Sequence, residues 1–291
     1  MTTQAGAAVV VGVDGSDRAL HATRLAAAEA VLHHRPLRIV HAMHWPRLSG
    51  GGRDVPPDSL TSQANVWLSA AVAAARKAAP GVAASAELLV GHPSVALRAA
   101  ADTAYLLVLG DHGLGGFTGL SGGSMAVQTA GHCPCPVLVA RGADRSGGPV
   151  VVGLDGSAAS ARTLECAAEE ASLRTAELVV LHATARPAPP ATTPHTPRQE
   201  QERALAEGVA GVAERFPDLP VRRELVTGSP AKALIDWSYR AQLMVVGCHG
   251  RAGLAGFLLG TVSRDLIHRA ACPVLVAPTA ARAERPGVAP A

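Results

Sequence analysis

The chain has 291 residues, about twice the length of an average domain, so either two domains or one large domain is expected. Hydrophobic residues make up 48% of it and charged residues 17%, which excludes an intrinsically disordered chain and indicates a globular fold with a core. The formal net charge of +3 and the 3% of aromatic residues argue against a protein that binds nucleic acid, because such proteins cluster Lys and Arg or stack bases on rings.

The sequence predicts neither a membrane helix nor a secretion signal. No apolar stretch approaches the roughly 18–20 residues that a membrane helix needs, and the first residues lack the basic character of a signal peptide. The five cysteines show no disulfide framework. Cys133-Pro134-Cys135 could belong to a metal or redox site, but without a second Cys or His pair nearby, ordinary burial is favoured. We therefore expect a cytoplasmic protein with reduced thiols.

In chain order, short apolar runs alternate with longer helical segments, which is typical of βαβ units around a parallel sheet. The first half is expected to form strands at 8–13, 37–43, 85–90, 105–110 and 136–140, and helices at 17–33, 59–79, 93–102 and 123–131. In the second half, strands are expected at 149–154, 177–183, 221–227, 242–247 and 273–277, again separated by helical stretches. Two longer connections rich in Pro or Gly, at 46–62 and 187–197, are expected to be mobile surface loops.

The two halves repeat one another. Val-Val-Val-Gly-Val-Asp-Gly-Ser at residues 9–16 returns with seven of eight residues identical at 150–157, and Cys-Pro-Val-Leu-Val-Ala at 135–140 returns at 272–277. A repeat this long means two copies of one domain. We expect domains at 1–143 and 149–279, joined by a short flexible linker near 141–149, and a disordered tail at 280–291.

A glycine-rich segment follows the fourth strand of each half. The first reads Gly110-Asp111-His112-Gly113 and, nine residues later, Gly123-Ser124; the second reads Gly247-Cys248-His249-Gly250 and then Gly260-Thr261 at the same spacing. Such glycines let the backbone approach a ligand, and the start of the next helix offers free N–H groups and a positive dipole end. The pattern indicates a phosphate site, although turns alone explain many glycine-rich loops.

The end of the first strand is the expected partner of this loop, because open parallel sheets bind ligands where the strand order reverses. Asp14 and Asp155 lie there, and each carboxylate could accept hydrogen bonds from a ribose or base, or reach Mg²⁺ through water. The alternative is that Asp14 and Ser16 only begin the first helix. Both interpretations hold if Ser16 or Asp17 is the cap and Asp14 faces the crevice.

Together these motifs resemble the universal stress protein family in its tandem, ATP-binding form, over residues 8–277. The resemblance implies an α/β fold, in which each half is an open five-stranded parallel sheet in the order 3-2-1-4-5 with helices on both faces, and one ATP in each half, with or without Mg²⁺. It also implies pairing of the two last strands within the chain, and leaves a homodimer open. The base would be held by backbone groups and aliphatic walls. The implied nucleotide-binding residues are Gly12, Asp14, Val40, Gly110, Gly113, Gly116, Gly123, Ser124 and Met125 in the first half, and Gly153, Asp155, Val180, Gly247, Gly250, Arg251, Gly253, Gly260, Thr261, Val262 and Ser263 in the second.

The two sites are not equal in sequence. The second has Arg251 and Ser263 where the first has Leu114 and Ala126, and Asp111 adds a negative charge beside the first loop. We expect tighter phosphate binding at the second site, by about 1–3 kcal/mol if one charge-assisted hydrogen bond makes the difference.

The histidines and the loop cysteine admit two interpretations each. His112 and His249 could contact phosphate, but solvent-facing strand ends are favoured. Cys248 could sense oxidation; because Asp111 stands at the equivalent position, a solvent-facing polar site is expected there instead. His41 and His182, at the ends of the second strands, are expected to be structural or near the base.

Three function classes follow from the sequence. The leading one is a nucleotide-dependent stress or regulatory protein with slow or no turnover, since no phosphate-loop lysine, kinase motif set or general base accompanies the loop. The alternative is a weak ATPase or a nucleotidyl-transferring enzyme in the same crevice. A dinucleotide-dependent oxidoreductase is disfavoured, because its glycine motif would follow the first strand.

Overall fold

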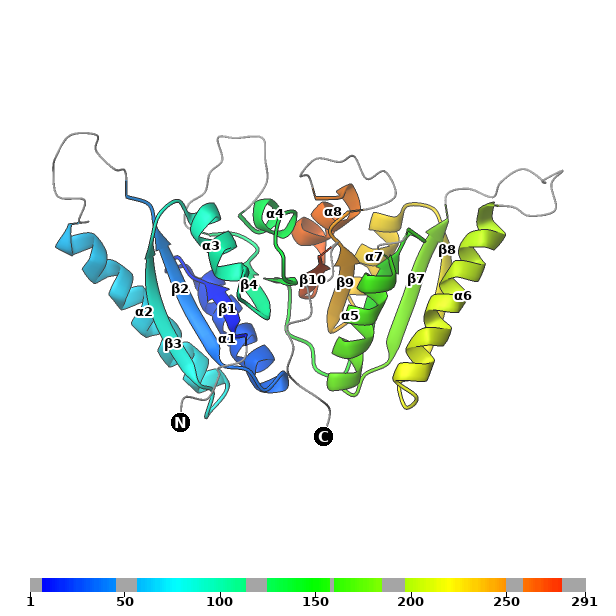
Figure 1. Cartoon of the computed structure of the whole chain (residues 1–291), viewed down its shortest axis with the longest axis horizontal. Helices are drawn as coiled ribbons and strands as arrows, with labels where there is room; N and C mark the ends of the chain where they lie inside the picture. The colour runs from blue at the N-terminus through cyan, green and yellow to red at the C-terminus, as the bar shows by residue number, and fades with distance from the viewer. Residues whose placement is uncertain are drawn as a thin grey trace.

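The computed structural model describes residues 7–45, 57–113, 125–157, 160–184, 197–249 and 259–278. The first half forms β1 (Val9–Gly12), α1 (Asp17–Leu32), β2 (Leu37–Met43), α2 (Asp58–Ala78), β3 (Ala84–Val90), α3 (Pro93–Ala101), β4 (Leu106–Gly110), α4 (Met125–Ala130) and β5 (Val137–Ala140). The second half forms β6 (Val150–Leu154), α5 (Ser160–Leu173), β7 (Leu178–Thr184), α6 (Pro197–Arg215), β8 (Val221–Thr227), α7 (Pro230–Ser238), β9 (Leu243–Gly247), α8 (Thr261–Arg269) and β10 (Val274–Ala277). The two halves stand side by side (Figure 1).

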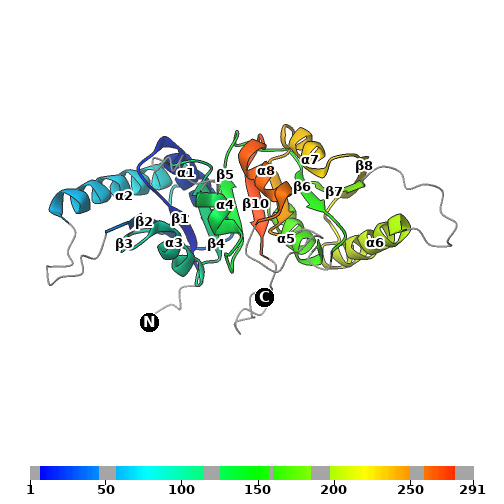
Figure 2. The same ribbon diagram turned by 90° about the horizontal axis from the view of Figure 1, so that it is seen from above.

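The strands join into one ten-stranded sheet in the order β3-β2-β1-β4-β5-β10-β9-β6-β7-β8. Within each half all neighbouring strands are parallel, which confirms the predicted order 3-2-1-4-5. At the junction β5 and β10 are antiparallel, with Leu138 opposite Leu275 (Figure 2). This junction is the pairing of last strands within one chain that the resemblance implied.

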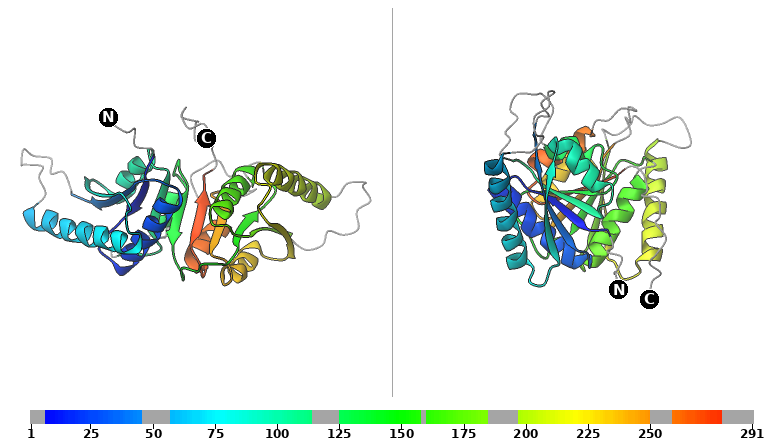
Figure 3. Two further views of the ribbon diagram at one scale, coloured as in Figure 1. Left: turned by 90° about the horizontal axis from the view of Figure 1, so that it is seen from below. Right: turned by 60° about the vertical axis from the view of Figure 1, so that its left-hand side comes forward.

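Helices cover both faces of this sheet (Figure 3). Because strand residues alternate between faces, they divide into two apolar clusters. One contains Val9, Val11 and Leu138 with residues of α1, α2, α5 and α6; the other contains Val10 and Val139 with residues of α3, α4, α7 and α8. Each cluster includes strands of both halves, so each face of the sheet carries one core that crosses the junction.

The segment at 141–149 is hydrogen-bonded to the second half. The Ala143 amide donates to the carbonyl of Ala271 (3.2 Å), and the Gln242 amide donates to the carbonyl of Pro149 (3.0 Å). Gly142 has φ +65°, and a Cβ there would lie 2.1 Å from the carbonyl oxygen of Ala271. These hydrogen bonds hold the segment to the second half, so the expectation of a flexible linker here is wrong. The close approach of the backbone at residue 142 requires glycine.

The predicted strands and helices are confirmed to within two residues at each end. One expectation fails in part, because α2 begins at Asp58 and so includes the end of the loop expected at 46–62. The rest of that loop, most of the loop at 187–197 and the tail expected at 280–291 lie outside the described residues. In the part of the chain that is described, no helix has the length and apolar character to cross a membrane.

Candidate functional site

Asp14 follows β1, the strand that lies between β2 and β4 at the point where the strand order reverses. Its Oδ1 accepts hydrogen bonds from the Ser16 amide (3.0 Å) and the Ser16 hydroxyl (2.7 Å). The Ser16 hydroxyl oxygen in turn accepts from the Ala19 amide (3.1 Å), so Ser16 is the N-cap of α1. Both interpretations of this motif are therefore compatible, since the cap is Ser16 and Asp14 has a second oxygen.

That second oxygen meets the loop after β4. A Cβ placed on Gly113 would lie 2.3 Å from Oδ2 of Asp14, which leaves room there for glycine alone unless the carboxylate moves. The structure thus brings Asp14 and Gly113, two predicted site residues 99 positions apart in the sequence, into contact at the carboxyl edge of the sheet.

The second half repeats the carboxylate geometry with a different partner. Oδ1 of Asp155 accepts from the Ser157 amide (3.0 Å) and from the hydroxyl of Ser160 in α5 (2.9 Å). Asp155 is therefore fixed to the start of α5 much as Asp14 is fixed to the start of α1.

The start of α8 borders the loop after β9. The Gly260 amide donates to the carbonyl of Cys248 (2.8 Å), which holds the helix start against the strand end. Gly260 is the N-cap residue and makes no side-chain capping bond, and the first-turn amides of Thr261, Val262 and Ser263 lie at the positive end of the helix dipole. This arrangement can attract an anion.

The structure changes the interpretation of two sequence differences, Ser263 and Asp111, from which we expected unequal phosphate binding. The hydroxyl of Ser263 is buried and donates to the carbonyl of Gly247 (2.6 Å), so it secures the strand end and is not directed at a ligand. Asp111 is 3% exposed and lies 3.5 Å from Arg18, and Cys248 at the equivalent position is 4% exposed. The expectation of a solvent-facing position there is wrong, because both side chains are buried. The third difference, Arg251 in place of Leu114, lies outside the described residues.

The remaining first-strand and second-strand residues contribute packing. A Cβ on Gly12 would lie 2.9 Å from side-chain atoms of Leu97 and Leu109, and one on Gly153 would lie 2.7 Å from Leu234. These glycines let α3 and α7 approach the sheet. Val40 and Val180 are fully buried in opposite apolar clusters, and the register pairs Gly12 with Val40 but Gly153 with Leu181. Leu181, not Val180, is therefore the counterpart of Val40.

An aromatic side chain lies beside the first site, which the expectation of purely aliphatic walls missed. Trp67 of α2 lies against Gly15, which has a φ of +87°. A Cβ added to Gly15 would lie 2.4 Å from the indole ring, so the indole packs directly on the glycine backbone. Trp67 also meets the His41 ring edge-on at 5.1 Å between centroids. The only signal in the sequence was the rarity of tryptophan, three in the chain, one of them in the first turns of the second helix.

The structure shows the contacts of the histidines that the sequence singled out. His41 donates from Nδ1 to the carbonyl of Val13 (2.7 Å) and His182 to that of Leu154 (2.9 Å), so both hold the second strand to the first. His112 is exposed, and Nδ1 of His249 lies 3.2 Å from Sγ of Cys248. The predicted residues Gly116, Gly123, Ser124, Gly250, Arg251 and Gly253 lie outside the described part of the chain.

The fold defines a tandem pair of open α/β domains, each with a carboxylate at its switch point, and in the first half Gly113 lies against that carboxylate. A comparison with protein-family models matches the universal stress protein family at residues 7–141 and 148–278. The chain belongs to the universal stress protein family.

Similar proteins share the tandem arrangement. Universal stress protein Rv2005c of Mycobacterium tuberculosis is 35% identical over 287 residues, covering 92% of this chain and 96% of the relative. Universal stress protein Rv2623 of the same organism is 34% identical over 285 residues, covering 92% and 95%. The crystal structure of a universal stress protein from Archaeoglobus fulgidus superposes with a TM-score of 0.71 at 19% identity, covering 96% of this chain and all of that one, which shows the shared fold.

Proposed function

We propose that this chain binds an adenine nucleotide, ATP, at the carboxyl edge of the sheet in each half, and that occupancy regulates its conformation or its choice of partner with slow or no turnover. The contact of Asp14 Oδ2 with Gly113 carries this proposal, because it joins the two motifs that a nucleotide would have to span. The resemblance of the motifs to those of ATP-binding members supports the choice of nucleotide.

Within this proposal the start of α8 holds phosphate in the second half, and Asp155 lies on the ribose or base side of the ligand. Asp14 does the same in the first half, where Trp67 adds an aromatic surface near the crevice. Mg²⁺ bound to the phosphates would neutralise their charge and could be reached by either carboxylate through water. We retain the expectation that the second site is the tighter one, because its sequence has Arg251 where the first site has Leu114.

The test has two steps. Mass spectrometry of small molecules released on denaturing the purified chain should find adenine nucleotide. Calorimetric titration of ATP should then show two sites, with Asp14→Ala and Asp155→Ala each weakening one of them by about tenfold or more, the effect of one charge-assisted hydrogen bond. Asp236→Ala, which removes an exposed carboxylate paired with Lys232 on α7, is the matched control and should leave both sites unchanged. Failure of ATP to bind the wild-type chain would refute the proposal.

The alternative of a weak ATPase or nucleotidyl transferase uses the same carboxylates as partners of Mg²⁺. Phosphate release above the spontaneous rate that disappears in the Asp14→Ala/Asp155→Ala double variant would favour it. Release that persists in the double variant would come from a contaminant.

A further inference from the structure

A cluster of four charged side chains lies between the two halves, away from the nucleotide crevices. Glu29 lies on α1 and His33 directly follows that helix; Glu170 lies on α5 and Arg174 directly follows it. Glu170 and Arg174 stand 141 positions after Glu29 and His33, the same offset as the first-strand repeat, so the cluster consists of two equivalent pairs, one from each half. Their side chains are between 3% and 12% exposed.

The two glutamates present one oxygen each to Arg174 and the other to His33. Arg174 contacts Oε1 of Glu29 and Oε2 of Glu170. On the opposite side, Nε2 of His33 lies 3.2 Å from Oε1 of Glu170 and 3.5 Å from Oε2 of Glu29. Among the described residues, neither this nitrogen nor Glu29 Oε2 has a hydrogen-bond partner, although both are fully buried. Three ligand-type atoms therefore face one another around a buried point.

The cluster carries a net negative charge that favours an additional cation. Two carboxylates and one guanidinium sum to a single negative charge before His33 is counted. Both carboxylates present an oxygen to the imidazole side of the cluster, so they stabilise a positive charge there, which either a proton or a metal ion can supply.

The spacing of the three atoms suits a tetrahedral ion. With metal–ligand bonds of about 2.0–2.1 Å, neighbouring ligands of a tetrahedral site lie about 3.3 Å apart, close to the 3.2 and 3.5 Å observed. Imidazole nitrogen and carboxylate oxygen are both ligand types that Zn²⁺ accepts. We propose that His33 Nε2, Glu29 Oε2 and Glu170 Oε1 bind one Zn²⁺ ion, which links α1 of the first half to α5 of the second.

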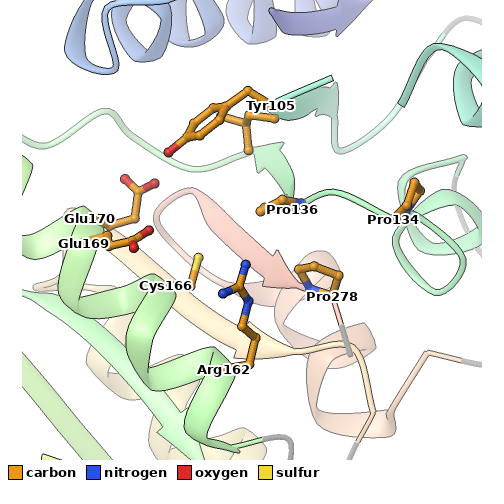
Figure 4. A pocket seen from close by; sticks show the side chains of 9 residues that line it. Tyr105, Pro134, Pro136, Arg162, Cys166, Glu169, Glu170 and Pro278 are labelled. Carbon is orange, nitrogen blue, oxygen red and sulfur yellow. The ribbon is translucent and has the colours of Figure 1, made fainter. Parts of the chain in front are cut away.

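Outer contacts orient these ligands as they do in known metal sites. The hydroxyl of Tyr105 lies 3.1 Å from Nδ1 of His33, which fixes the ring and directs Nε2 toward the glutamates. Arg174 fixes both carboxylates from the side away from His33. In Figure 4 the hydroxyl end of Tyr105, from the first half, points toward Glu170 of the second.

Two cavities lie beside the cluster. One of about 100 Å³ is lined by Tyr105, Cys166 and Glu170. The other, of about 340 Å³, is lined by Glu29, Arg174 and Asp144. Each cavity therefore borders one of the two glutamates.

Zinc titration of chelator-treated full-length chain tests the proposal. Calorimetry and elemental analysis after dialysis should show one tightly bound Zn²⁺ per chain, and His33→Gln and Glu170→Gln should each weaken binding at least tenfold. Glu169→Gln is the matched control: this neighbouring carboxylate contacts Arg215 instead, and the variant should bind as wild type does. Cys133→Ser, which breaks the Cys133/Cys135 pair, should also bind normally. Unchanged affinity in His33→Gln, or an equal loss in Glu169→Gln, would overturn the proposal.

Crystals of the wild-type chain soaked in Zn²⁺ decide the matter even if a variant fails to fold. Anomalous scattering at the zinc edge should place one ion within about 2.2 Å of the three named atoms. A peak elsewhere, or the absence of any peak at this point, would show that His33 carries a proton and that the cluster is an ion-pair network only.

Discussion

At the scale of single residues, the contact between Asp14 and Gly113 makes the first crevice sensitive to one methyl group. Gly113→Ala would place a Cβ 2.3 Å from Oδ2 of Asp14, so the carboxylate has to turn away. Turning it breaks the two hydrogen bonds from Ser16 to Oδ1. We expect ATP affinity at the first site to fall about tenfold, the cost of one charge-assisted bond.

Calorimetric titration of the Gly113→Ala variant measures this loss. Gly211→Ala provides the control, since Gly211 lies exposed in α6 with nothing within 4 Å of an added Cβ. If both variants bind ATP equally, the carboxylate does not contribute to binding.

Two glycines in the central strands act through packing. Gly12→Ala would force its Cβ within 2.9 Å of Leu97 and Leu109, and Gly153→Ala within 2.7 Å of Leu234. We expect each to lower the free energy of unfolding by about 1–3 kcal/mol, the usual cost of overpacking a core. Gly211→Ala should raise it by about 0.5–1 kcal/mol through helix propensity. Urea unfolding of the three variants tests the opposite signs.

At the scale of elements, the antiparallel pair β5–β10 joins the halves. Leu138 and Leu275 are opposite one another and 1% exposed. Replacing either with alanine should cost about 2–5 kcal/mol. Because the side chains are neighbours, the double variant should show a coupling energy of about 0.5 kcal/mol or more, whereas Leu138→Ala and Leu178→Ala, on separate strands of the two halves, should add. Denaturant unfolding of this cycle gives the coupling, and additivity in both pairs would show that the junction contributes no direct contact.

The sequence predicted these elements well because their signals are local. Continuous apolar runs such as Leu106–Leu109 are typical of strands covered on both faces, and Ser16 marks the start of α1. The sequence also placed Gly113 near the end of the first strand, and Asp14 does meet Gly113, whereas most of each glycine-rich loop lies outside the described residues.

Contacts between distant elements could not be predicted in this way. Trp67 reaches Gly15 only because α2 packs beside α1, and the side chains of Glu29 and Glu170 meet only because β5 pairs with β10. The counterpart of Val40, by contrast, could have been predicted, because the first-strand offset of 141 positions carries Val40 onto Leu181 and the strand register is the same in both copies.

At the scale of the whole molecule, the two halves share more than a linker. One sheet runs through both, each of its two cores includes strands from both, and the charged cluster joins α1 to α5. Domains joined only by small, polar interfaces unfold separately, but a shared core couples them. We therefore expect the full chain to unfold in one cooperative transition.

Scanning calorimetry distinguishes one cooperative unit from two independent halves by the size of the unfolding enthalpy. At about 0.7 kcal/mol per residue, a single unit of this size should show an unfolding enthalpy near 200 kcal/mol around 60 °C, with the van't Hoff value equal to it. Independent halves would give a van't Hoff enthalpy near 100 kcal/mol, or two separate peaks. The Leu138→Ala/Leu275→Ala double variant, which removes core contacts where the shared core crosses the junction, should unfold with a pattern closer to that of independent halves. A wild-type chain that already unfolds in two steps would show that the shared sheet does not couple the halves.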